Sequence, residues 1–304
     1  MKGLCKSNLK LLALILLALV QPTNSSEAPL EPRAIMQFSS ALHESSALAS
    51  RGKHLWTLND SGNGALIFKL DKIGNELKSY QMENTINSDW ESLASDANFL
   101  YIGDIGNNFN RRRKLTIYRI AWEDIEQPEP SAQKITFIYA DYRSGLPMSH
   151  DFDSEAIAIH GDEVWLFTKN RGDRNSNLYR FPKLPGHYRS KTTQVLPVNS
   201  LVTAADIHPK TRQLVLISTK KTSEGGKTIL WLAPTSDFGV DWASHKSMEI
   251  APHDQWEAVV WDSESSGIFL THENNKRGFA GLAKLSLEAI SKGLLRDYQR
   301  PSTE

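Results

Sequence analysis

The stretch DWESLASDANFLYIGDIG, residues 89–106, contains two short β-rich runs joined by turn residues, with an acidic pair at its start. Four other stretches resemble its opening: HESSALAS (43–50), DSEAIAIH (153–160), TAADIHP (203–209) and QWEAVVWD (255–262). The acidic residues that mark these five openings are Glu44, Glu91, Glu155, Asp206 and Glu257. Successive markers are 47, 64, 51 and 51 residues apart. The chain therefore carries an internal repeat of about fifty residues.

Each opening is followed by further runs of β-branched and aromatic residues, such as HLWTLND, EVWLFTKN and QLVLIST. Gly, Asn, Asp and Pro separate the runs, as in strands joined by turns. Most units contain four such runs, and four short strands in about fifty residues form one blade of a propeller. We therefore predict an all-β fold, a single β-propeller of five blades. A sixth, degenerate blade and a β-sandwich are the alternatives.

The last unit lacks a clear fourth strand, because LEAISKGLLRDYQ near the C-terminus has helical spacing. A spare strand-like run, RAIMQFS, begins at Arg33, ahead of the first unit. We expect this run to pair with the last blade and close the ring, which would remove exposed sheet edges. The propeller domain is predicted over residues 27–304, with a short helical tail.

Residues 1–26 have the pattern of a cleaved signal peptide. Three lysines precede the apolar run LLALILLALV (11–20), and small polar residues follow it. Ten apolar residues are too few for a spanning helix, so no membrane span is expected after cleavage. The single cysteine, Cys5, precedes the apolar run, and the mature chain would have none. Disulfides and thiolate chemistry are then excluded. We expect an exported protein, periplasmic or secreted.

The charges are balanced, with 35 basic and 35 acidic residues in the whole chain. This balance argues against a nucleic-acid partner, which requires an excess of basic surface. The basic run RRRK (111–114) is interpreted as a solvated turn. A small polar ligand or a protein of the cell envelope is the expected partner.

The repeat predicts where acidic side chains gather. In a propeller the innermost strands line the central channel, so residues at their starts converge on one mouth, to which the second strands return. Metal ligands are predicted at Asp89, Glu91, Asp104, Asn107, Asn108, Asp153 and Glu155. Other ligand-binding residues are predicted at Glu44, Asp60, Asp206, Glu257 and Glu273. Catalytic roles are assigned to Glu91, Glu155, Lys169 and His272.

Crowded carboxylates raise one another's pKa, and a bound cation relieves the repulsion. Hard ions such as calcium prefer carboxylate and amide oxygens, so calcium is the predicted cofactor. Structural roles, such as capping backbone N–H groups, are the alternative for each single acid.

The motifs LWTLNDSGN, DWESLA, YIGDIGNN, DSEAIAI and VTAADIHP resemble those of a group of exported bacterial β-propeller proteins. The resemblance runs from about residue 40 to 275. This group is described as propeller or WD-repeat-like, and sometimes as related to phytase-like esterases. The resemblance implies the fold and export more than a reaction. The chain departs from the group at SSALA, where a glycine is usual, and at GDIGNN, where an aspartate is more common.

Three functions fit these observations. The first is an exported propeller that binds an ion or small polar ligand at its acidic axial mouth. The second is a calcium-dependent phosphoesterase or esterase-like hydrolase, with Glu91 or Glu155 as general base and Lys169 or His272 steadying the leaving group. The third is a glycoside hydrolase that uses the axial carboxylates Glu91, Asp153 and Glu257. No nucleophile elbow, P-loop or dinucleotide fingerprint occurs in the sequence.

Overall fold

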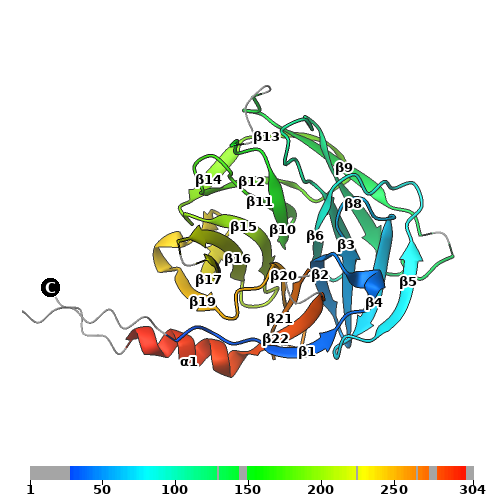
Figure 1. Ribbon diagram of the computed structural model, residues 1–304. Helices are drawn as coiled ribbons and strands as arrows, with labels where there is room; N and C mark the ends of the chain where they lie inside the picture. Colours follow the sequence, from blue (N-terminus) through cyan, green and yellow to red (C-terminus); the bar gives the residue numbers. More distant parts are fainter. Residues whose placement is uncertain are drawn as a thin grey trace, which may run out of the picture.

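The computed structural model describes residues 28–298, apart from 129, 144–148, 224, 265 and 274–278. The predicted signal peptide lies outside the described residues and stays a prediction. The strands form five sheets arranged around a central axis, which confirms the five-bladed propeller (Figure 1). The sixth blade and the sandwich are therefore excluded.

Each blade follows the chain from the axis outward. Blade 1 contains β2 (Ser45–Arg51), β3 (His54–Asn59), β4 (Leu66–Asp71) and β5 (Glu76–Gln81). Blade 2 contains β6 (Trp90–Ser95), β7 (Phe99–Asp104), β8 (Leu115–Ala121) and β9 (Gln133–Tyr139). Blade 3 contains β10 (Ser154–His160), β11 (Glu163–Thr168), β12 (Ser176–Pro182) and β14 (Thr192–Leu196). Blade 4 contains β15 (Leu201–Ile207), β16 (Gln213–Thr222), β17 (Gly225–Ser236) and β19 (Lys246–Ile250), with the short β18 (Gly239–Val240) at its rim.

Blade 5 is built from both ends of the chain. It contains β20 (Trp256–Trp261), β21 (Gly267–His272), β22 (Gly281–Ser286) and, as its outer strand, β1 (Arg33–Gln37). Strand β1 pairs antiparallel with β22, so the prediction that the N-terminal run closes the ring is confirmed. Closure in this way leaves the last blade with a complete sheet although the C-terminal segment turns helical.

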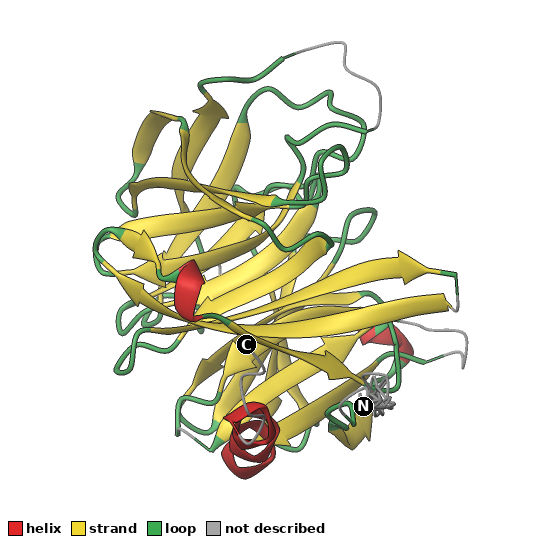
Figure 2. Ribbon diagram, turned by 90° about the vertical axis from the view of Figure 1, so that its left-hand side faces the viewer, coloured by secondary structure: helices red, strands yellow, loops and turns green. Residues whose placement is uncertain are grey.

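That helix, α1 (Leu287–Tyr298), lies at the periphery beside blade 5, and the 3-10 turns η1 (Ser40–Leu42) and η2 (Trp242–Ser244) are short (Figure 2). None of the described helices is long and apolar enough to cross a membrane.

Blades 2 and 3 share a strand. Strand β13 (Gly186–Ser190) leaves blade 3 after β12, pairs parallel with β9 at the outer edge of blade 2, and the chain then returns to blade 3 as β14. The backbone groups of β9 that would otherwise face solvent are thereby paired. This exchange fastens the two blades together on their outer side.

The core lies between the blades. The innermost strands of neighbouring blades contact one another round the ring, from β2 through β6, β10, β15 and β20 back to β2. Aromatic residues fill the space between adjacent sheets, with Trp90, Trp165 and Tyr101 fully buried. Burying a large side chain of this kind stabilises the fold by about 2–3 kcal/mol. The frame that carries the axial residues is therefore rigid.

Candidate functional site

A β-bulge near the start of the innermost strand recurs in every blade. In β10, for example, Ser154 pairs with Thr168 and Ala156 with Phe167, so Glu155 has no partner in the ladder. The bulged residues of the five blades are Ser46, Glu91, Glu155, Thr203 and Glu257. Because a bulge re-aims the side chain of the extra residue, it explains how acids on a buried strand reach the mouth of the channel.

A second set of side chains reaches the same mouth from the ends of the second strands. In four blades the residue after the second strand donates its N–H to the carbonyl two residues before the bulge, at 2.9–3.1 Å. These donors are Asp60, Ile105, Lys169 and Glu273. The repeated hydrogen bond places two more carboxylates and one ammonium group beside the bulged acids.

Three carboxylates from blades 1 and 2 form the tightest group at the mouth. Asp60, Asp89 and Glu91 each offer one oxygen, and these three oxygens lie within 4.8 Å of one another. Glu91 is 7% exposed, and no described residue donates a hydrogen bond to its carboxylate. Gly106 lies against the group: a Cβ built there would be 2.3 Å from Asp89 Oδ2 and 2.8 Å from Glu91 Oε1. A glycine at this position therefore leaves room for the two carboxylates.

The other predicted metal ligands have protein partners instead. Asp104 accepts hydrogen bonds from Arg112 Nη2 at 2.7 Å and from the Asp89 N–H at 3.0 Å. Asn107 uses its side-chain amide on the backbone: Nδ2 donates to the Phe152 carbonyl at 3.0 Å, and Oδ1 accepts from the Arg112 N–H at 2.8 Å. These two side chains hold the turn that follows β7 in place. Their predicted role as metal ligands stays a prediction.

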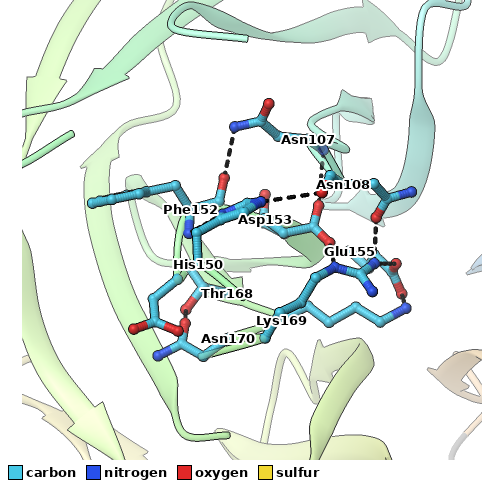
Figure 3. Close-up of polar contacts among 12 residues, drawn as sticks. Asn107, Asn108, His150, Phe152, Asp153, Glu155, Thr168, Lys169 and Asn170 are labelled. Carbon is cyan, nitrogen blue, oxygen red and sulfur yellow. Dashed lines mark hydrogen bonds and ion pairs between the residues drawn. The ribbon is translucent and has the colours of Figure 1, made fainter. Parts of the chain in front are cut away.

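Asp153, Asn108 and Glu155 contact two cations of blade 3 (Figure 3). Arg171 Nε donates to Asp153 Oδ2 at 2.8 Å, and its Nη2 contacts the Asn108 side-chain oxygen. Lys169 Nζ donates to Glu155 Oε2, and Arg171 Nη2 lies 3.9 Å from the other oxygen of that carboxylate. Arg171 and Lys169 thus balance part of the negative charge on the blade 3 side of the mouth.

The crowding of carboxylates shifts their pKa values upward. Burial raises the pKa of Glu155 to about 8, with Lys169 opposing the shift and Glu257 adding to it. Burial likewise raises the pKa of Glu257 and Glu273 to about 7 and that of Asp89 to about 6. Several acids at this mouth therefore carry protons near neutral pH unless a cation binds.

The same crowding acts on Glu91 and Lys169 in different ways. Burial, then the charge of Glu155, raises the pKa of Glu91 well above its usual range. Burial alone would lower the pKa of Lys169, but Glu155, Glu257 and Glu91 outweigh it and raise that pKa. Lys169 therefore stays charged at neutral pH, as the cation that the surrounding carboxylates share.

Asp206 does not belong to this mouth. It lies near the far end of β15, opposite Val215, where its carboxylate accepts hydrogen bonds from the N–H groups of Ile207 and Trp261 at 2.9 and 2.8 Å. The residue of blade 4 at the bulge is Thr203. The repeat was aligned by matching acidic residues, which placed Asp206 at the position that Thr203 occupies, three residues earlier in the chain.

Glu44 and His272 lie at the mouth in different settings. Glu44 accepts a 2.6 Å hydrogen bond from Asn63 Nδ2 and is one of the charges that raise the pKa of Asp60 and Glu273, after burial. The His272 Nδ1 lies 3.0 Å from the carbonyl oxygen of Glu273, and the ring packs edge-on against Trp256. These contacts place the His272 ring at the mouth in blade 5, and its predicted catalytic role stays a prediction.

Three residues of this site were not predicted: Arg112, Arg171 and Gly106. Arg112 belongs to the basic run interpreted as a solvated turn, yet its Nη1 donates to the Gly106 carbonyl at 2.7 Å and its Nη2 to Asp104. Arg171 follows Lys169 by two residues. Side chains two residues apart in an extended segment point to the same side, so this spacing was a signal for both cations. Gly106 lies in the turn that follows β7, and glycine in a turn is too common to indicate a close approach.

No family model matches the chain, and no curated protein matches it. Among solved structures, the catalytic domain of a GH62 α-L-arabinofuranosidase from Coprinopsis cinerea has a TM-score of 0.46 at 10% identity, over 84% of this chain and 97% of that one. The α-L-arabinofuranosidase PaAbf62A from Podospora anserina, in complex with cellotriose, has 0.46 at 12%, over 85% and 97%. The WD40 propeller domain of Doa1 has 0.43 at 9%, over 85% and 98%. The chain is a five-bladed β-propeller similar to these, and the comparisons identify no specific family.

Proposed function

We propose that the protein is an exported β-propeller whose axial mouth binds a divalent cation through Asp60, Asp89 and Glu91. One observation carries the proposal: three carboxylate oxygens lie within 4.8 Å of one another, and the buried Glu91 carboxylate accepts no hydrogen bond from a described residue. Carboxylates this close to one another repel when they are charged, and burial adds to the cost of their charged forms. A cation placed among the three oxygens would offset both effects.

The ligand atoms indicate a hard ion. All three are carboxylate oxygens, and no histidine or thiolate belongs to this group. Oxygen-only sets favour calcium, magnesium or manganese over zinc or copper. Calcium, which accepts irregular geometry and additional waters, is the ion we propose.

The test is a calcium titration of EDTA-treated protein followed by thermal unfolding. An ion that binds only the native state stabilises it by about 2.7 kcal/mol at a hundred times its Kd. For a chain of this size, that corresponds to a rise in Tm of very roughly 5–10 °C. We expect Asp89→Asn and Glu91→Gln to abolish the rise and Glu76→Gln, an exposed residue of β5, to retain it.

Magnesium and manganese are titrated in parallel, and zinc serves as the soft-ion comparison. A Tm that does not change with any of these ions contradicts the proposal. Equal rises in the wild type and in Glu91→Gln would show that calcium binds elsewhere.

A second candidate function is hydrolysis at the same mouth. The observation that favours it is the position of Lys169, whose charge acts on Glu91 and Glu257 and whose ammonium group contacts Glu155. A cation that polarises an ester or phosphoester, a carboxylate that accepts a proton from water and an ammonium group that stabilises the leaving group would together make a hydrolase.

The raised pKa values of Glu155 and Glu257 also suit a general acid, as glycoside hydrolysis requires. A panel of p-nitrophenyl phosphate, acetate and glycosides, with and without calcium, separates these reactions. Turnover that disappears in Glu155→Gln and Lys169→Met but survives in Glu76→Gln, an exposed residue of β5, supports hydrolysis. Calcium binding without turnover on any substrate supports the binding function alone.

Export rests on the basic leader and apolar run at residues 2–20. Expression of the full chain in a bacterial host, followed by fractionation and N-terminal sequencing, tests it. Recovery of the protein from the periplasm or the medium with a new N-terminus near residue 26 is the expected result, and full-length protein in the cytoplasm contradicts it. A small polar ligand or an envelope protein remains the proposed partner.

A further inference from the structure

The central channel has a second opening, on the face opposite the acidic mouth. A cavity of about 410 Å³ lies there. Each of the five blades contributes the end of its innermost strand and the turn that follows that strand. The contributing segments are 50–52, 95–97, 159–161, 206–212 and 260–263. The cavity is therefore a second axial pocket, within the size range of small-molecule sites.

The carboxylates of this pocket already have partners. Asp206 accepts hydrogen bonds from two backbone N–H groups at 2.8 and 2.9 Å. Asp96 pairs with Lys183 at 3.0 Å, and Asp262 pairs with Lys284 at 3.1 Å. The acids at this end of the channel are therefore engaged in holding blades and turns, unlike Glu91 at the other end.

The donors of the pocket, in contrast, are available. No hydrogen bond or ion pair joins a described residue to the side chains of Arg51, Lys210 or Ser95, although the Arg51 guanidinium lies 4.7 Å from the ring centre of Trp122. The imidazole of His160 is 5% exposed, and its Nε2 has no hydrogen-bond partner within the described part of the chain. Unused donors and cations, next to satisfied acids, favour an anionic ligand.

The walls between these groups are apolar. Ile159, Ile207 and Val260 line the cavity beside Trp261, whose indole N–H is used on the Gln213 carbonyl at 2.9 Å. An apolar wall with a few placed polar groups is typical of sites for small organic molecules. A bare inorganic anion would leave these walls in contact with water.

We infer that this second axial pocket binds a small organic carboxylate with a flat apolar body. The apolar part lies against Ile159, Ile207 and Trp261, and the carboxylate faces Arg51 and Lys210 at the rim. The Ser95 hydroxyl is the remaining donor near the channel. This inference is independent of the acidic mouth and of any cation bound there.

Benzoate is the probe, and benzamide, of the same shape without the charge, is its matched comparison. We expect saturable benzoate binding by calorimetry, at least tenfold tighter than benzamide binding, and the same with and without saturating calcium. In spectra of ¹⁵N-labelled protein, the backbone amides of Gly52, Ala97 and Gly161 should shift during the titration. These amides lie in the turns that line the pocket.

The double variant Arg51→Gln with Lys210→Gln should weaken benzoate binding at least tenfold. Lys221→Gln, an exposed lysine near the end of β16 outside this pocket, is the charge-matched control and should bind as the wild type does. Ser95→Phe should fill the channel and abolish binding. If that variant does not fold, the two charge variants and the amide shifts decide the question.

Three outcomes overturn the inference. They are no saturation by benzoate up to its solubility limit, equal binding of benzamide, and wild-type benzoate affinity in the double charge variant. Shifts confined to amides near Lys169 would place the anion at the other mouth and also contradict it.

Discussion

The backbone N–H of Asn107 donates a 2.8 Å hydrogen bond to the carboxylate of Asp153, which is fully buried. The bond joins the turn after β7 in blade 2 to the start of β10 in blade 3. Arg171 binds the other oxygen of the same carboxylate. One side chain therefore links the two blades beside the carboxylates Asp60, Asp89 and Glu91.

Replacing Asp153 with alanine should destabilise the fold by about 3 kcal/mol. The change leaves the Asn107 N–H without its acceptor and removes one of the partners of the Arg171 guanidinium. Urea unfolding measures the loss. Asp162→Ala, whose side chain is fully exposed, is the matched control and should change stability by less than about 0.5 kcal/mol. A loss for Asp153→Ala no larger than for this control would contradict the structural role.

Stability in the absence of divalent ions should fall as pH rises from about 5 to 8. Glutamate titrates near 4.3 in an unfolded chain, whereas Glu257 and Glu273 have pKa values of about 7 in the folded protein and Glu155 about 8. Between these limits the native state binds more protons than the unfolded state. The free energy of unfolding therefore decreases with pH across that window.

Thermal unfolding in EDTA at a series of pH values checks this trend. Glu257→Gln removes one of the raised carboxylates and should flatten the slope, while Glu76→Gln on the exposed face of β5 should leave it unchanged. A Tm that rises between pH 5 and 8 in the wild type would show that these carboxylates are stabilised in their charged form.

Gly106→Ala tests the geometry of the proposed cation site at Asp60, Asp89 and Glu91 without altering its charge. The added methyl group would occupy the space of the Asp89 carboxylate and press on Glu91. We expect the variant to fold but to lose the calcium-dependent rise in Tm. Gly64→Ala is the control, since a Cβ there meets its nearest atom at 3.7 Å. Full calcium stabilisation in Gly106→Ala would argue that the ion does not use Asp89.

Gly74 provides a test of ring closure. It has a φ of +91°, and a Cβ there would lie 2.7 Å from Met36 Cβ in β1. Gly52 has a φ of +53°, with nothing within 4 Å of the added atom. Both alanine variants pay the cost of a left-handed backbone, about 1–2 kcal/mol. Gly74→Ala should lose about 1–2 kcal/mol more, because it also displaces the closing strand.

The comparison of the two alanine variants by urea unfolding tests the contact with Met36, together with the difference between the two backbone conformations. Equal losses in both variants would mean that β1 adjusts without cost. A larger loss in Gly74→Ala would assign the extra free energy to the contact between blade 1 and the strand that completes blade 5.

The repeat, the five blades and the closing strand were predictable, because they depend on local alternation and on turn residues. The positions of single axial residues were less so. Matching acids aligned Glu44 and Asp206 with Glu91, whereas the bulges align Ser46 and Thr203 with it. A bulge adds one residue to a strand, and no particular residue type marks that position in the sequence. The position of the bulge is set by pairing with the neighbouring strand.

The contacts that sort the acids were also beyond the sequence. Asp104 and Asp60 both follow or end a second strand, yet Asp104 meets Arg112 while Asp60 faces Asp89 and Glu91. Asp104 is neutralised by a loop of its own blade that folds back, whereas Asp60 lies beside acids of a neighbouring blade. Contacts of this kind join distant segments and produce no periodic pattern in the sequence.

The recurrent bulge has one consequence for how this molecule could change over time. The bulged residue has no partner in the ladder of its own blade. In this ring the position already holds serine, threonine and glutamate on the same backbone. The five bulged residues lie around one axis. Substitution at these positions could change which ligand the mouth binds without changing the strand pairing of any blade.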